Sequence, residues 1–208
     1  MKSISLKAAF AAVLLVAVAP ALAQKRGHPP LGQRGGFLIQ TDADFGGETL
    51  ATVYYDYDDY DYDDDYFSQK IRAGQGFALS VGGWFRPIES SALEIQASVG
   101  YKYESTYFTD SDVSFSRTLL QLEALYRWPN GFFVGAGVMR HMNSKLSGDD
   151  YYGPIEFDDV NGLSLEAGWR WISLHYTGIQ YAIDPYIKDI DGNSIGIRFT
   201  WRPGERWF

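Results

Sequence analysis

Two places in the chain hold the residues best equipped for chemistry: a run of aspartates and a short histidine-threonine pair. Seven aspartates lie within ten positions between Asp56 and Asp65, interleaved with tyrosines. Closely spaced carboxylates attract Ca²⁺ or Mg²⁺, because these cations prefer oxygen ligands. The run has no glycine at a fixed place and no defined ligand spacing, so it does not match an EF-hand loop. We expect a solvated acidic surface loop, with specific cation binding as the alternative.

His175, Tyr176 and Thr177 form the best candidate for nucleophilic catalysis. In such a site the hydroxyl of Thr177 is the nucleophile and His175 is its base. Asp189, in a predicted loop, is the available option for the acid. The surrounding alternation turns His175 and Thr177 inward, so a non-catalytic histidine in the interior is the expected role. His28 and His141 have no partner at ligand spacing, and we predict no catalytic residue, cofactor or metal site.

Strands must position these residues, because much of the chain alternates between apolar and polar residues. The clearest case is the last segment, 194–201. It points Ile195, Ile197, Phe199 and Trp201 to one side and Ser194, Gly196, Arg198 and Thr200 to the other. A period of two is that of a strand, and such a pair of faces is typical of a wall between lipid and a polar interior.

Eight such strands are predicted, an even number as in bacterial outer-membrane barrels. Residues 36–45 are expected to form only an extended lead-in to the first. The strands are expected at 48–57, 71–86, 93–104, 113–128, 132–142, 162–171, 172–183 and 194–201. The fold class is therefore an all-β, eight-stranded antiparallel transmembrane up-and-down β-barrel.

The polar faces of these strands contain charges of both signs. An eight-stranded barrel is only wide enough inside for side chains, and buried charges need partners. We therefore expect a salt-bridged plug in which Arg198 pairs with Glu94, Glu123 or Glu166, and a narrow conducting channel is the alternative. The predicted inward set is Glu94, Gln96, Lys102, Gln121, Glu123, Arg127, Glu166, Arg170, Arg198 and His175.

The connections alternate in length, which is the asymmetry of an outer-membrane barrel with short periplasmic turns and longer extracellular loops. Long ones are predicted near 58–68, 105–112, 143–160 and 185–193, and short ones at 87–91, 129–131 and 171–172. A soluble sandwich or lipocalin-like barrel would instead turn its apolar faces inward. Aromatic residues at the ends of the apolar faces look like membrane girdles: Tyr101, Tyr103, Tyr126, Trp128, Trp169 and Trp171.

The first 23 residues have the pattern of a secretory signal peptide. A cationic start precedes an apolar run from Ala8 to Ala19, and Ala21-Leu22-Ala23 is a good cleavage site. Residues 24–46 are expected to form a periplasmic arm and lead-in, and 47–208 the barrel domain. Losing Lys2 and Lys7 takes the formal charge from −8 to −10, so nucleic acid is not an expected partner. The chain has no cysteine, which excludes disulfides.

The predicted mature chain resembles small eight-stranded outer-membrane barrel proteins of the opacity-protein and outer-membrane-protein-A transmembrane type. Its closing strand is similar to their assembly signal, with Ser194, Gly196, Phe199 and Trp201 in the polar, glycine and aromatic places. The resemblance implies that Gly196, Phe199 and Trp201 are recognised by the barrel assembly machinery of a Gram-negative bacterium. Family members usually stop at the aromatic residue, whereas residues 202–208 follow here.

The expected function is that of a non-enzymatic protein of the cell envelope, with a structural or surface-interaction role. Its expected partners are outer-membrane lipids and lipopolysaccharide, its expected state is a monomer, and its ligand is unknown. The alternatives are a channel and a hydrolase that modifies lipid A. The second rests on His175 and Thr177, which resemble the His-x-Ser of outer-membrane lipid A deacylases with threonine in place of serine.

Overall fold

A computed structural model describes residues 34–54, 68–88, 92–106, 113–148, 153–183 and 187–203. The predicted signal peptide, most of the predicted arm, the aspartate run and residues 204–208 lie outside this range. The described residues contain no helix that could cross a membrane. They form the strands β1 (Gly35–Gly46), β2 (Thr49–Tyr54), β3 (Ser68–Arg72), β4 (Gly76–Phe85), β5 (Leu93–Ser105), β6 (Ser114–Arg127), β7 (Phe132–Ser147), β8 (Ile155–Phe157), β9 (Val160–Trp169), β10 (Ile172–Gly178), β11 (Gln180–Ile183), β12 (Ile187–Asp191) and β13 (Ser194–Trp201).

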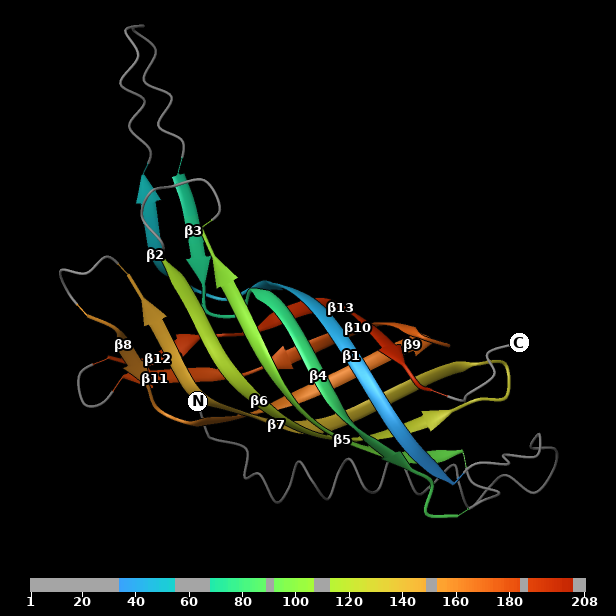
Figure 1. The fold of residues 1–208 in the computed structure, drawn as a ribbon. Helices are drawn as coiled ribbons and strands as arrows, with labels where there is room; N and C mark the ends of the chain where they lie inside the picture. Colours follow the sequence, from blue (N-terminus) through green and yellow to red (C-terminus); the bar gives the residue numbers. More distant parts are fainter. Residues whose placement is uncertain are drawn as a thin grey trace, which may run out of the picture.

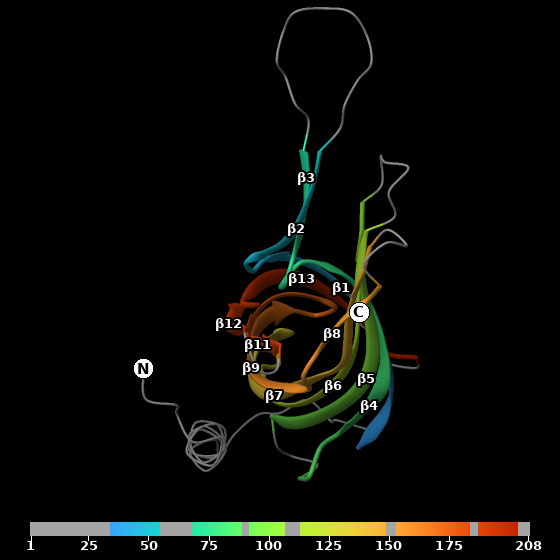
Figure 2. The same cartoon turned by 90° about the vertical axis from the view of Figure 1, so that its left-hand side faces the viewer.

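Eight of these strands close a barrel (Figures 1 and 2). Each pairs antiparallel with its neighbour in the order β1, β4, β5, β6, β7, β9, β10 and β13. The last strand returns to the first, from the pair Ile39–Trp201 to the pair Gly46–Ser194. Closure pairs both edges of the sheet. The predicted eight-stranded antiparallel barrel is confirmed.

The prediction was wrong about the first barrel strand. Residues 36–45, expected as a lead-in, lie in β1, whereas Thr49–Tyr54 pairs with β3 in a separate hairpin that projects from one end of the barrel (Figure 1). Gly46 and Gly47, with φ of 129° and 83°, turn the chain between them. The alternation in β1 is hard to see because the small residues Thr41 and Ala43 interrupt its outward apolar face.

The seventh predicted strand was likewise too long. β10 ends at Gly178, and residues 180–183 pair with β12 in another hairpin beyond the barrel. Trp171, expected at the end of a strand, lies in the turn between β9 and β10. The strand ends that flank the long connections lie at one end of the barrel and those that flank the short turns lie at the other, as the alternation of lengths predicted. Arg34 lies at the short-turn end, where its carbonyl accepts a bond from Arg86 N.

A hydrophobic cluster closes the barrel at the long-connection end. It contains Ile71, Ala73, Phe115, Leu146, Phe157, Ile179 and Tyr181. The rings of Phe115, Phe157 and Tyr181 meet edge to face at centroid distances of 5.3 to 5.9 Å. Burial raises the pKa of Tyr181 to about 12, and its hydroxyl contacts Nδ1 of His141. We call this set the cap cluster.

Candidate functional site

The barrel is apolar outside and charged inside. Phe77, Leu79 and Leu165 on the outer face are each more than half exposed. The inward face buries polar residues on every barrel strand, among them Gln40, Glu94, Arg117, Ser164 and Arg198. Water-soluble proteins have the opposite arrangement. The alternation of outward and inward side chains that the period of two predicted is confirmed over 76–85 and 93–104.

Arg198 lies at the centre of the interior, which we call the lumen. Its Nε donates to Asp42 Oδ1 at 2.8 Å, and its Nη1 donates to Glu123 and Glu166, both at 3.0 Å. Its Nη2 donates to Asp42 Oδ2 at 3.2 Å and to Gln121 Oε1 at 3.1 Å. The predicted pairing with Glu123 and Glu166 is confirmed. Asp42 is not in the predicted inward set, because it lies in the segment that was predicted to be a lead-in.

Glu94 forms a second network at the short-turn end, and its partner is not Arg198. Arg202 donates from Nη1 to Glu94 Oε2 at 3.1 Å and from Nη2 to Oε1. Arg86 and Arg127 approach the same carboxylate at 3.4 and 3.7 Å. Arg202 follows β13 directly, so the first residue after the closing strand contributes to the lumen. Arg202 lies outside the inward set that was predicted from the sequence.

Arg170 was predicted to point into the lumen, and this prediction was wrong. It lies half-buried in the tight turn between β9 and β10, with a φ of 57°. Its guanidinium carbon lies 4.4 Å from the centroid of the Trp169 ring. Since a two-residue turn reverses the chain there, the alternation of β9 does not continue through it.

A third network lies toward the cap cluster. Lys102 Nζ approaches Asp44 Oδ2 and donates to the carbonyl of Gly74, both at 2.7 Å. Nε2 of His175 lies 2.6 Å from the other oxygen of Asp44. Gly196 makes this approach possible, because a Cβ there would lie 2.1 Å from Asp44 Oδ1. The glycine of the predicted assembly signal therefore also has a packing role.

The residues of the catalytic alternative have different partners from those expected. His175 and Thr177 are buried on the inner face, as their alternation indicated. The carboxylate that contacts His175 is that of Asp44, whereas Asp189 is exposed on β12. Within the described ranges, no three histidines and carboxylates lie close enough together to hold a metal ion. The hydrolase alternative stays a prediction.

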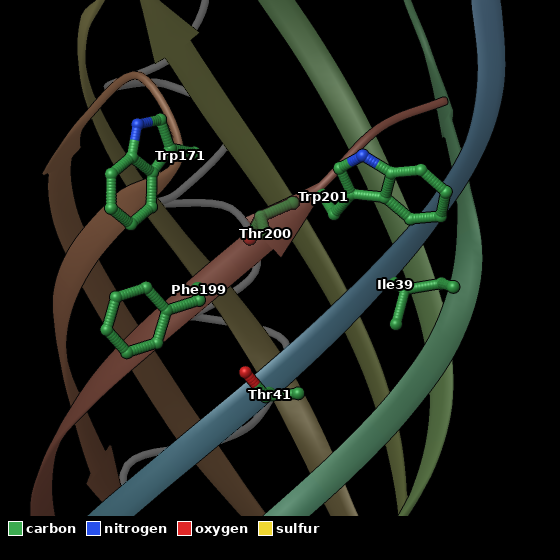
Figure 3. Close-up of a pocket in the computed structure, with 6 residues that line it drawn as sticks. All are labelled: Ile39, Thr41, Trp171, Phe199, Thr200 and Trp201. Atoms are coloured by element: carbon green, nitrogen blue, oxygen red, sulfur yellow. The ribbon is translucent and has the colours of Figure 1, made fainter. Parts of the chain in front are cut away.

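The outer surface has a shallow groove where β1 meets β13 (Figure 3). Its volume is about 290 Å³, and it is lined by Ile39, Thr41, Trp171, Phe199, Thr200 and Trp201. Trp171 and Phe199 stack at 5.6 Å on one side, while Ile39 and Trp201 lie on the other. This lining has no ionisable group, so it suits an apolar chain and offers nothing for acid-base chemistry.

The chain matches no known protein-family model and no curated protein. The two faces of the barrel are therefore the main indication of its function.

Proposed function

We propose that the protein is an integral outer-membrane β-barrel protein with a structural or surface-interaction role. The observation that carries the proposal is the inversion of the two faces, with large apolar side chains outside and paired charges inside. In water, such a belt would be a large exposed apolar surface, which soluble monomers avoid. A bilayer covers the belt, and closure leaves no unpaired barrel edge in lipid.

The ends of the barrel support one orientation. The short turns are expected in the periplasm and the long, acidic connections outside, where divalent cations could bridge Asp158 and Asp159 to lipopolysaccharide. The signal peptide directs export, and Gly196, Phe199 and Trp201 are the residues offered to the assembly machinery. The lumen networks favour a plug over a channel, because the buried charges bond to one another.

The test uses arginine on the outer face. Leu165 is 54% exposed and Ile155, on β8 beyond the barrel, is 45% exposed. In water, either substitution by arginine is close to neutral. In a bilayer, Leu165→Arg costs about 2–4 kcal/mol near the midplane, whereas Ile155→Arg costs little.

The measurement is the free energy of unfolding in lipid vesicles, together with fractionation and the gel mobility shift on boiling. We expect the wild type in the outer-membrane fraction, with a boiling-dependent shift, and a loss of stability for Leu165→Arg alone. A wild-type protein in the soluble periplasmic fraction, or equal stability of both variants, would contradict the proposal. Planar-bilayer recordings test the channel alternative, and the lipid A profile of a His175→Ala strain tests the hydrolase.

A further inference from the structure

Arg117 differs from the other buried cations of the lumen. Arg198 contacts three carboxylates, and Lys102 contacts the carboxylate of Asp44. Glu94 is the counter-ion of three arginines, Arg86, Arg127 and Arg202. Arg117 is completely buried, and no carboxylate of the described residues lies within ion-pair distance of it. A buried charge without a counter-charge is strongly unfavourable.

The contacts that Arg117 does make leave most of its donors unused. Nη2 donates to the carbonyl of Gln75 at 2.8 Å, and the guanidinium carbon lies 4.5 Å from the ring centroid of Phe115. Nε and Nη1 are buried and have no hydrogen-bond partner. Glu104 lies on the inner face of the neighbouring strand and attracts Arg117 electrostatically, but it forms no hydrogen bond with it, and its carboxylate accepts from the backbone N–H of Arg72 at 3.3 Å. Desolvated donors of this kind need an acceptor.

The flanking strands add donors beside Arg117. Lys102 is its direct register partner on β5, and both side chains point inward and are buried. On β7, the register shifts between Ser116 and Thr118, which places Asn143 and Ser144 opposite Arg117. Ser144 is the inward member of this bulge, and its Oγ is buried without a partner. Two like charges in register repel each other unless something negative lies between or beside them.

We propose that a small inorganic anion of the chloride class binds in the lumen beside Arg117, between Lys102 and Ser144 and below the cap cluster. The anion accepts hydrogen bonds from Nε and Nη1 of Arg117 and from Oγ of Ser144. It supplies a negative charge in direct contact with Arg117, which forms no ion pair with a carboxylate of the described residues. A water molecule could accept the same hydrogen bonds, but it would bring no negative charge to Arg117, whereas Lys102 already has Asp44 at 2.7 Å.

The first test is crystallographic and uses the whole wild-type protein, folded in detergent and soaked in sodium bromide. Bromide scatters anomalously and replaces chloride. We expect an anomalous peak in contact with Arg117 Nε or Nη1 and with Ser144 Oγ. Ordered water at that place, without a bromide peak, would overturn the proposal.

The second test measures unfolding as chloride replaces gluconate at constant ionic strength. A ligand that binds only the folded state raises the stability with its concentration. We expect the unfolding midpoint of the wild type to rise with chloride, the rise to be lost in Arg117→Met, and the rise to weaken in Ser144→Ala. Arg140→Met is the matched control, because Arg140 lies on β7 but forms an exposed pair with Asp159 at 3.0 Å.

The control must keep the full chloride response. An equal response in Arg117→Met, or no response in the wild type, would overturn the proposal. If Arg117→Met does not fold, the bromide experiment decides, since it needs no variant. Neither test depends on the proposed location in the outer membrane, because both use the purified barrel.

Discussion

Replacing Arg198 by methionine tests whether the lumen networks hold the barrel together. The change keeps a long side chain but removes the cation that three carboxylates share, those of Asp42, Glu123 and Glu166. Each of these contacts is 3.0 Å or shorter, and the side chain of Arg198 is 1% exposed. The carboxylates would then be left buried without their main partner.

The expected loss is large for a single substitution. Breaking a buried ion pair by removing one partner costs about 3–5 kcal/mol, mostly because the remaining charge stays desolvated. We therefore expect Arg198→Met to lower the free energy of unfolding by at least about 3 kcal/mol. Arg140→Met removes a pair whose side chains are 48% and 43% exposed, and such pairs contribute about 1 kcal/mol or less.

The assay is equilibrium unfolding in urea, followed by tryptophan fluorescence in detergent micelles and extrapolated to zero denaturant. A triple variant, Arg198→Met with Asp42→Asn and Glu123→Gln, removes two of the three carboxylates that lose their partner. Because residues in one network couple, this triple variant is expected to be more stable than Arg198→Met alone. A loss for Arg198→Met no greater than that of Arg140→Met, or a triple variant less stable than the single one, would refute the reasoning.

Three further predictions concern other parts of the barrel. Gly196→Ala is expected to lower the free energy of unfolding by about 1–3 kcal/mol, because the new methyl group would overlap Asp44 Oδ1. Gly83→Ala should lower it less, because a Cβ there would meet only a backbone oxygen at 3.4 Å. Unfolding in urea compares the two variants. Arg202→Met should lower the free energy of unfolding less than Arg198→Met does, because Arg86 and Arg127 still lie near Glu94. A larger loss of stability for Arg202→Met than for Arg198→Met in the same urea assay would contradict this network. The pKa of Tyr181 is raised to about 12 from 10.0, so as the pH rises the phenol loses its proton in the unfolded chain before it does so in the folded protein. The contribution of the protonated phenol to stability should therefore be present below pH 10 and decrease between pH 10 and 12. Unfolding of the wild type and of Tyr181→Phe across that range, together with phenolate absorbance, measures this contribution.

The faces of the strands were predictable because alternation is a local property. Phe77, Leu79 and Val81 point outward and Ala78 and Ser80 inward whichever strand lies beside them. The hairpins β2–β3 and β11–β12 were not separated from the barrel strands, because they continue the same extended backbone beyond it. Where the barrel ends depends on which neighbour each strand pairs with, and that information is not local.

Pairing in the lumen was predictable only where the barrel strands were assigned to the right residues. Arg198 and Asp42 are 156 positions apart and meet only because the last strand pairs with the first. Assigning β1 to the lead-in therefore removed Asp42 and Asp44 from the interior, and with them the main partners of Arg198, Lys102 and His175. The two aspartates alternate with Thr41, Ala43 and Phe45, and this period of two is the pattern from which β1 could have been predicted.

The inward and outward alternation of side chains continues for one residue beyond the closing strand. Pro203 has no backbone N–H, so β13 cannot extend its ladder through that position, and it ends at Trp201. The alternation nevertheless continues for one residue, which turns Arg202 inward to Glu94. Without Arg202, Glu94 would keep the two more distant arginines at 3.4 and 3.7 Å and the hydrogen bond from Gln96 at 2.9 Å. Arg202 therefore supplies a cation to Glu94, whereas the cation of the closing strand, Arg198, pairs with Asp42, Glu123 and Glu166.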